Sequence, residues 1–325
     1  MRDGTFVSWR ADESTRSRVI TRTPSVDSSP MARVMAVANQ KGGVGKTTTV
    51  HCLGRALAEA GRSVLLVDLD PQACLTYSLG LDPEGLEGSL HDVFVRSASV
   101  VDVLVRTGPQ DPMTADGRAV GGRADGQVAG SRTASGTLDL LPATIDLAGS
   151  EVHLLARTGR EHALARALSG IGADYDAVLI DCPPSLGVLT INGLSAAEEV
   201  LIPLQCEALS MRGVGQLMAT IDDVREFTGS KVAVRGIIPT MFDERTRHGR
   251  EVLETVQAQY QVPVLEPPVP KSIRFAEAPS RGMSLLEHAP RSPGALAYRR
   301  LAGQLDPGLR NSAARGRVRR AGARS

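Results

Sequence analysis

One glycine-rich stretch decides the fold of this chain: residues 41–48 read Lys41-Gly42-Gly43-Val44-Gly45-Lys46-Thr47-Thr48. Glycine adopts left-handed backbone conformations without strain, so a loop of this kind can turn successive N–H groups inward on a phosphate chain. The lysine of its Gly-Lys-Thr triplet, Lys46, would reach the β- and γ-phosphates of a nucleotide, and the Thr47 hydroxyl would bind Mg²⁺. The stretch therefore predicts a phosphate-binding loop.

The segments on either side of this loop support the prediction. Residues 33–38 form an apolar run of strand length, and residues 47–60 are expected to form a helix directly behind the loop. A phosphate would then lie at the N-terminus of that helix, where free N–H groups and the helix dipole favour an anion.

Further apolar runs of strand length alternate with helix-length stretches, at residues 63–68, 138–141, 176–181, 199–204, 232–238 and 262–265. Near-continuous runs of Val, Leu and Ile are typical of strands that are buried on both faces. We therefore predict an α/β fold with a mostly parallel, doubly wound sheet flanked by helices. The even spacing of the runs favours one large domain over residues 33–305.

Three segments have compositions that cannot bury enough apolar surface to fold alone. Residues 1–32 are rich in Ser, Thr and Arg, residues 107–137 are rich in Gly, Ala, Arg and Asp, and residues 306–325 contain six arginines. We expect a disordered N-terminal extension, a flexible insert within the domain and a basic, disordered tail.

Composition narrows the classes of function. The formal net charge is +1 and the pI is about 7.8, so any nucleic-acid binding must come from a local basic patch. No apolar run reaches the roughly 18 to 20 residues of a membrane span, and residues 1–30 lack the apolar core of a secretory signal. The cysteines lack the sequence spacing of metal ligands. We therefore expect a cytoplasmic protein in which the thiols are reduced and mostly buried. The cysteines are Cys52, Cys74, Cys182 and Cys206.

Carboxylates stand at the ends of two predicted strands, where ligands gather in a doubly wound sheet. Asp68 ends the run at 63–68, and Asp70 comes two residues after it. Asp181 ends the run at 176–181. Mg²⁺ prefers oxygen ligands and keeps several waters, so we expect Asp181 to hold this ion through one of them.

With Lys41 at its start, the loop is similar to the deviant Walker A motif of the ParA/MinD group of P-loop ATPases, which have a SIMIBI-type fold. Other segments resemble the same family in the same order, and the resemblance covers about residues 33–305: DLDPQ at 68–72, DCPPS at 181–185, PTMFD at 239–243 and PKSIRFAEAP at 270–279. It implies the cofactors ATP and Mg²⁺.

The resemblance also assigns roles to residues. It implies that Lys41 crosses a dimer interface to the phosphates of the partner's ATP and that Asp70 positions or polarises the attacking water. Asp68 is expected to support the magnesium ion and hydrogen bonds within its loop. The expected catalytic residues are thus Lys41, Lys46 and Asp70. The expected magnesium ligands are Thr47, Asp68 and Asp181.

The expected ATP contacts comprise residues 41–48 together with two residues near the adenine, Met241 and Pro270. Lys271 replaces the arginine that is usual in the family, so a planar or bidentate contact is not expected there. ParA/Soj members form ATP-bound homodimers that bind DNA without sequence preference and release it after hydrolysis stimulated by a ParB-type centromere-binding partner. The family's DNA contacts correspond to Arg245 and Arg274.

The resemblance thus implies a cytoplasmic, nucleoid-associated ATPase that segregates chromosomes or plasmids. Two alternatives stay open. A ParA-like ATPase that positions a protein cargo on the nucleoid is barely distinguishable by sequence. A MinD-like division-site ATPase would end in an amphipathic membrane helix, and residues 306–325 contain too few large apolar residues for an apolar face, so no membrane partner is expected.

Overall fold

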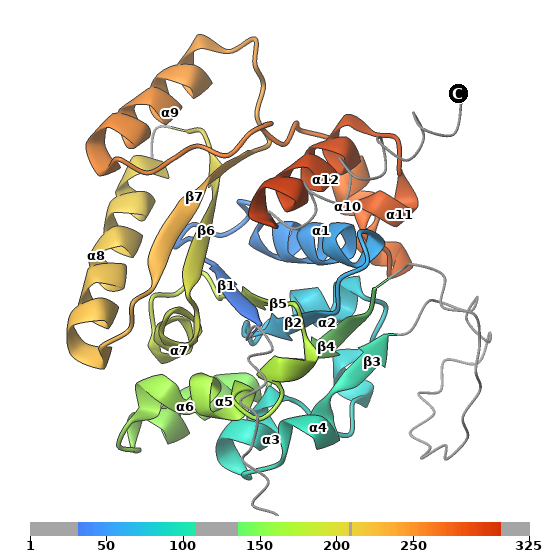
Figure 1. Cartoon of the computed structure of the whole chain (residues 1–325), viewed down its shortest axis with the longest axis vertical. Coiled ribbons are helices and arrows are strands. Elements are labelled where there is room, and N and C mark those ends of the chain that lie inside the picture. Colours follow the sequence, from blue (N-terminus) through green and yellow to red (C-terminus); the bar gives the residue numbers. More distant parts are fainter. Residues whose placement is uncertain (1–31, 108–135, 208–209, 307–325) are drawn as a thin grey trace, which may run out of the picture.

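The computed structural model describes residues 32–107, 136–207 and 210–306. A seven-stranded sheet with the order β3-β4-β2-β5-β1-β6-β7 forms the centre of this region (Figure 1). All neighbouring strands pair in parallel except β3 and β4, which are antiparallel. The strands are β1 (Arg33–Val37), β2 (Val64–Asp68), β3 (Val105–Thr107), β4 (Leu138–Leu141), β5 (Ala177–Asp181), β6 (Glu199–Gln205) and β7 (Ala233–Thr240).

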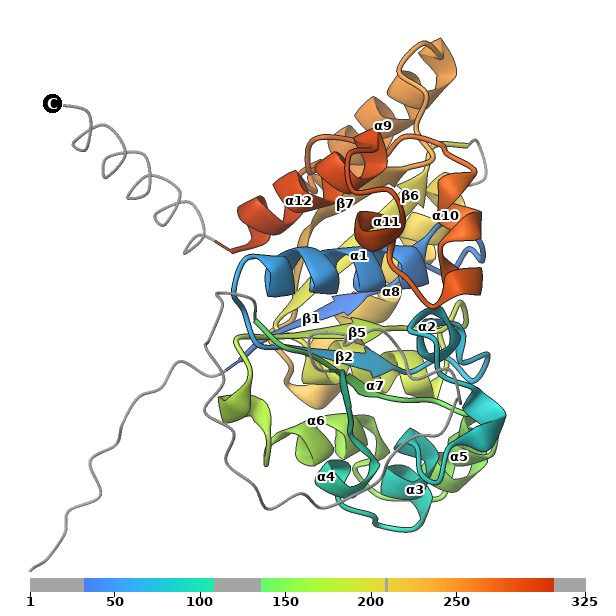
Figure 2. The same ribbon diagram turned by 90° about the vertical axis from the view of Figure 1, so that its right-hand side faces the viewer.

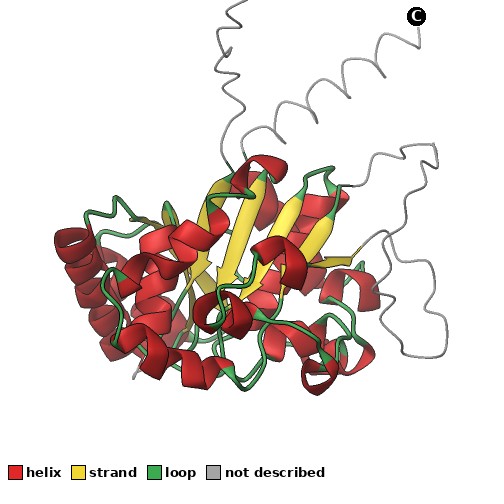
Figure 3. Ribbon diagram, turned by 90° about the horizontal axis from the view of Figure 1, so that it is seen from below, coloured by secondary structure: helices red, strands yellow, loops and turns green. Residues whose placement is uncertain are grey.

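Helices cover both faces of the sheet, as Figures 2 and 3 show. One face packs against α1 (Lys46–Glu59), α2 (Cys74–Ser78), α11 (Leu285–His288) and α12 (Pro293–Leu305). The other face packs against α3 (Leu90–Val95), α4 (Val100–Val103), α5 (Leu147–Leu155), α6 (Ala163–Leu168), α7 (Val188–Ala196), α8 (Ser210–Thr228) and α9 (Arg247–Tyr260). The short helix α10 (Arg274–Glu277) precedes α11. This arrangement confirms the predicted fold class.

The central strands supply side chains to both hydrophobic cores, because successive residues of a strand point to opposite faces. In β2, Leu65 and Val67 belong to the core under α3–α8, whereas Val64 and Leu66 pack under α1 and α12. Every residue of β2 and β5 is buried. Burial on both faces explains why these strands read as unbroken apolar runs.

One predicted strand is wrong. Residues 262–265 pair with β7 only through the isolated bridge between Ile237 and Val264. Proline has no N–H to donate to a ladder, and Pro263 lies within this segment while Pro267 and Pro268 come after it, so the segment runs beside β7 as an irregular chain. The structure also contains a strand that we did not predict, the three-residue edge strand β3.

The structure reaches slightly beyond the predicted domain limits. Ala32, expected in the extension, is buried and its N–H donates to the Gly172 carbonyl. Thr107, expected in the insert, ends β3, and Asp306, expected in the tail, accepts a hydrogen bond from Arg62. The remainder of these three segments, except Gly136 and Thr137, lies outside the described residues. Within the described ranges, no helix is both long and apolar enough to cross a membrane.

Candidate nucleotide-binding site

The loop at 38–45 joins the carboxyl end of β1 to α1, as predicted. Gly43 and Gly45 have φ angles of 74° and 87°, a left-handed conformation that disfavours any residue with a Cβ. Asn39 anchors the start of the loop: its Nδ2 donates to the Pro203 carbonyl at 2.7 Å, and its Oδ1 accepts from the Lys41 N–H at 3.0 Å. These hydrogen bonds to the rest of the chain hold the loop in shape.

Thr240, at the end of β7, anchors the other side of the loop. Its hydroxyl donates to the Val44 carbonyl at 2.8 Å, and Val44 itself is fully buried. The loop is thus held by β6 through Asn39 and by β7 through Thr240. The side chain of Val44 belongs to the core beneath the site and does not line the cavity, and the predicted contact of this residue with ATP stays a prediction.

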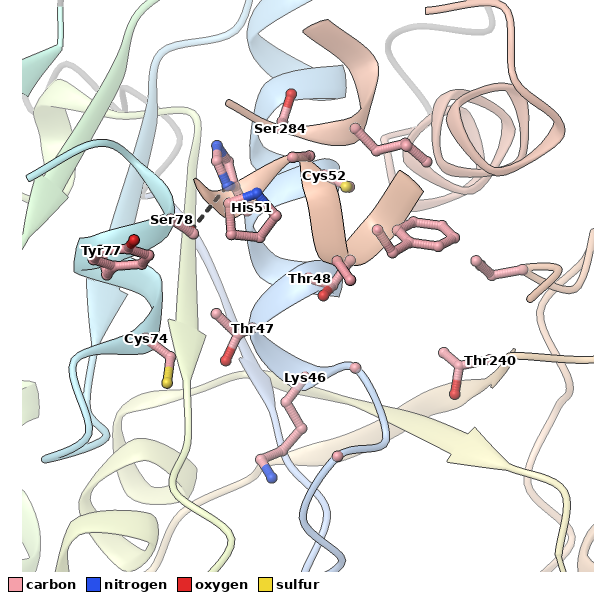
Figure 4. A pocket seen from close by; sticks show the side chains of 18 of the residues that line it. Lys46, Thr47, Thr48, His51, Cys52, Cys74, Tyr77, Ser78, Thr240 and Ser284 are labelled. Atoms are coloured by element: carbon pink, nitrogen blue, oxygen red, sulfur yellow. Dashed lines mark hydrogen bonds between the residues drawn. The ribbon is translucent and has the colours of Figure 1, made fainter. Parts of the chain in front are cut away.

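A cavity of about 770 Å³ opens over this loop, within the usual size range of ligand sites. Figure 4 shows Lys46, Thr47 and Thr48 together at the start of α1, with Cys74 and Tyr77 of α2 to one side and Thr240 across from them. Asp70 also lines it. The predicted ATP contacts that line the cavity are Gly42, Gly43, Gly45, Lys46, Thr47, Thr48 and Met241.

Pro270, a predicted ATP contact, does not line this cavity. Pro270 forms a bridge with Phe242 and lines a second hollow of about 810 Å³ beside Arg245. Its two neighbours, Val269 and Lys271, line the nucleotide cavity instead. The predicted contact between Pro270 and ATP therefore stays a prediction.

Lys46 is only 7 % exposed. Burial lowers the pKa of its ammonium group, while Asp181 and then Asp70 raise it. The ammonium group donates to the Lys41 carbonyl at 3.4 Å. A cation held between the loop carbonyl and these carboxylates can neutralise phosphate charge.

Asp68 and Asp181 lie opposite each other at the carboxyl ends of the adjacent strands β2 and β5. Both carboxylates are fully buried, and burial raises their pKa values, to about 6 for Asp68 and well above the usual range for Asp181. Asp68 accepts three hydrogen bonds, from the Thr76 N–H, the Thr76 hydroxyl and the Asp70 N–H. These are the loop hydrogen bonds expected of Asp68.

Asp181 differs, because neither of its carboxylate oxygens has a hydrogen-bond partner in the described part of the chain. An orphaned buried carboxylate is costly unless a cation satisfies it, and this one lies near Thr47, the predicted ligand on α1. Among the described residues, no group of three or more His, Cys, Asp or Glu side chains could hold a metal. An unpaired buried carboxylate beside a threonine hydroxyl fits a Mg²⁺ ion that takes its remaining ligands from water and phosphate.

Lys41 lies outside the cavity of its own chain. Its ammonium group donates to Glu207 at 2.5 Å and to Gln205 at 3.4 Å, both at the end of β6. The side chain is 30 % exposed. Lys46 therefore lines the phosphate site of its own chain, whereas Lys41 does not.

The two predicted DNA contacts are both exposed but differ in their surroundings. The Arg245 guanidinium donates to both carboxylate oxygens of Asp243 at 2.9 Å. Arg274 opens α10 and forms no ion pair with a residue of the described ranges. A phosphate group would compete with Asp243 for Arg245, whereas Arg274 is open to it.

The cysteines are free, and only two of them are fully buried as expected. Burial raises the pKa of the Cys52 thiol to about 12 and that of Cys182 still further, which makes both unreactive packing groups. Cys206 is half-buried. Cys74 is exposed at the cavity wall, contrary to the general expectation of burial.

Comparisons with known proteins agree with this site. A family model described as an AAA domain matches residues 32–234. Soj, the sporulation initiation inhibitor protein of Bacillus subtilis, is 39 % identical over 272 residues, which cover 84 % of this chain and 97 % of Soj. The chromosome partitioning protein ParA of Caulobacter vibrioides is also 39 % identical over 272 residues, covering 83 % of this chain and 92 % of ParA.

A crystal structure from Mycobacterium smegmatis, titled cobyrinic acid a,c-diamide synthase with bound ATP analog and magnesium, is 48 % identical. It covers 84 % of this chain and 94 % of its own, with a TM-score of 0.67. The similarity in both fold and sequence therefore extends over nearly all of the described residues.

Proposed function

Because the chain belongs to the ParA/MinD family of P-loop ATPases, we propose that it is an ATPase that dimerises with ATP, binds DNA non-specifically and segregates chromosomes or plasmids with a ParB-type partner. One observation carries the proposal: a preformed phosphate loop faces a cavity beside an orphaned buried carboxylate, Asp181. A nucleoside triphosphate with its Mg²⁺ would supply the missing partners of both. Such a protein would act in the cytoplasm, on the nucleoid.

Nucleotide binding follows from the loop. The N–H groups at the start of α1 and the ammonium group of Lys46 would bind the phosphates, and the adenine would lie beside Met241 and Lys271, which line the cavity. Thr47 and Asp181 would hold Mg²⁺, with Asp68 as a further, buried support. The bound ion would stabilise the charge that develops during phosphoryl transfer.

Hydrolysis needs an oriented water more than a strong base. Asp70 lies at the cavity wall with one carboxylate oxygen accepting the Gln72 N–H at 3.0 Å, which leaves the other oxygen for a water. Lys46 offsets the negative charge of the phosphates. We expect slow hydrolysis until a partner completes the site.

Dimerisation is supported by the position of Lys41. Because its side chain lies on the surface beside Glu207, away from its own cavity, it is available to a second copy of the chain. If Lys41 exchanged its contact with Glu207 for a contact with the phosphates of the partner's ATP, dimerisation would depend on the nucleotide.

We predict that Lys41→Ala binds ATP with near-normal affinity but stays monomeric, because each site loses the cation that the other copy provides. Light scattering with and without ATP measures the oligomer, and titration calorimetry measures the affinity. Lys231→Ala, which removes an exposed lysine before β7, is the matched control and should dimerise normally. ATP-dependent dimers of undiminished stability in Lys41→Ala would sink the idea.

DNA binding is proposed for Arg245 and Arg274. A few phosphate contacts per copy, doubled in a dimer, give salt-sensitive binding that a monomer lacks. We predict that replacing both residues with Glu removes ATP-dependent DNA binding, while ATP binding and dimerisation survive. Anisotropy of a labelled random duplex, at several salt concentrations, checks this.

A second pair of exposed arginines, Arg160 just before α6 and Arg166 within it, gives a control with the same change of charge. That Arg160→Glu/Arg166→Glu variant should bind DNA nearly as well as the wild type. Truncation after Asp306 should weaken binding mildly and keep its dependence on ATP. If truncation abolishes binding while the Arg245/Arg274 variant binds normally, the assignment of these two arginines is wrong.

The identity of the protein that accelerates hydrolysis tests the alternative that this chain positions a protein cargo. A ParB-type centromere-binding protein from the same genome should accelerate hydrolysis in the presence of DNA. Acceleration by a cargo protein alone, with no effect of the ParB-type protein, would instead favour cargo positioning.

A further inference from the structure

Thr76 is a buried polar residue that forms hydrogen bonds with Asp68. It lies in α2, is fully buried and does not line the nucleotide cavity. Its backbone N–H and its hydroxyl both approach the same oxygen of Asp68, Oδ2, at 2.8 and 2.7 Å. Two donors from one residue hold that carboxylate in a single orientation.

The other oxygen of Asp68 faces the catalytic loop. Asp68 Oδ1 accepts the Asp70 N–H at 3.3 Å, so the carboxylate links Thr76 to the backbone of Asp70. The N-cap residue of α2, Ala73, has a left-handed φ of 51° and caps no N–H with its side chain. Asp68 therefore serves as the cap of α2 and as the anchor of the loop at 69–73.

A third contact joins Thr76 to another loop. The Ala143 N–H lies 3.1 Å from the Thr76 hydroxyl oxygen, in the segment that follows β4. Because a hydroxyl has one hydrogen and Thr76 donates it to Asp68, Ala143 must be the donor. Direct hydrogen bonds thus connect Ala143 through Thr76 and Asp68 to Asp70.

We propose that Thr76 is a positioning residue for ATP hydrolysis: by orienting Asp68, it fixes the backbone of Asp70 and hence the carboxylate that orients the attacking water. This inference rests on the proposed role of Asp70. Thr76 touches neither nucleotide nor metal in this arrangement, so its removal should affect the chemical step more than binding.

Thr76→Val keeps the shape of the side chain but removes the hydroxyl, and Thr76→Ser keeps the hydroxyl. We expect kcat of Thr76→Val to fall about tenfold, as for loss of one hydrogen bond to a charged group, while KM and ATP affinity stay near wild-type values. Thr76→Ser should recover most of the rate. Like a variant that lacks the Asp70 carboxylate, Thr76→Val should accumulate as an ATP-bound dimer.

Ser150→Ala is the control, because it removes another fully buried hydroxyl, bonded to His91 at 2.9 Å, away from the cavity. It should hydrolyse ATP at the wild-type rate. The proposal is overturned if Thr76→Val has a wild-type kcat, if Ser150→Ala loses as much, or if both Thr76 variants lose ATP affinity and thermal stability together. A wild-type chain that binds ATP but never hydrolyses it would instead contradict the proposed ATPase function.

Discussion

Replacement of Lys46 with alanine should abolish ATP binding at working concentrations. Lys46 is the buried cation of the phosphate loop, and truncating one partner of a buried charge pair costs about 2 to 5 kcal/mol. That cost corresponds to a loss of affinity of roughly 30- to 5000-fold. Titration calorimetry with ATP and Mg²⁺ measures it directly.

Two controls make this result specific. The Lys231→Ala variant should bind ATP as the wild type does. The thermal unfolding midpoint of Lys46→Ala without nucleotide tests whether the variant is folded, and we expect a modest decrease because the buried Asp181 carboxylate loses its nearby cation. Unchanged ATP affinity in a folded Lys46→Ala protein would remove the loop at 41–48 from the proposed mechanism.

The second large effect concerns Asp70. Asp70→Ala should bind ATP normally and lose hydrolysis by about 100-fold or more, a typical effect of removing a group that orients or accepts the proton of a nucleophile. Binding survives because the Asp70 N–H still donates to Asp68, which keeps the loop in place. Phosphate release measures the rate, and size-exclusion chromatography with ATP should show an accumulated dimer.

Asp70→Asn helps to separate charge from shape. The amide has the size of the carboxylate but no charge, so it should also stall hydrolysis if charge orients the water. Asp102→Ala provides an aspartate control away from the cavity, at an exposed position of α4, and should leave the rate unchanged. A wild-type rate in Asp70→Ala would exclude Asp70 from catalysis.

The parts of the fold that were predictable are those that leave a local signal in the sequence. The doubly buried strands β2 and β5 are unbroken apolar runs, and the phosphate loop has its glycines in fixed positions. The segment at 262–265 is also apolar, yet Pro263 within it and the prolines after it prevent a ladder. The edge strand β3 has three residues, too few for any periodicity to appear.

Contacts between distant residues left no such signal. Asn39 reaches Pro203 and Thr240 reaches Val44 across more than 160 positions, and neither residue was predicted to shape the loop. The same holds for Thr76 and its bond to Ala143. A polar residue shortly after a strand, as Asn39 is two residues after the end of β1, was the only available hint.

The positions of two predicted site residues show the same limit. Pro270 belongs to the matching segment, but pairing with Phe242 turns its neighbours Val269 and Lys271 toward the cavity. Which residue of an irregular segment faces a site depends on that pairing, and no period of the sequence encodes it. The ion pair between Lys41 and Glu207 could not be predicted either, because the sequence does not show that the end of β6 lies beside the loop.

The most direct test of the account is the mass of the full-length chain by light scattering, with Mg²⁺ and either ATP, ADP or no nucleotide. The account predicts a dimer with ATP and a monomer in the other two conditions. A chain that binds ATP by calorimetry but keeps the same mass in all three conditions would contradict the claim that ATP controls dimerisation.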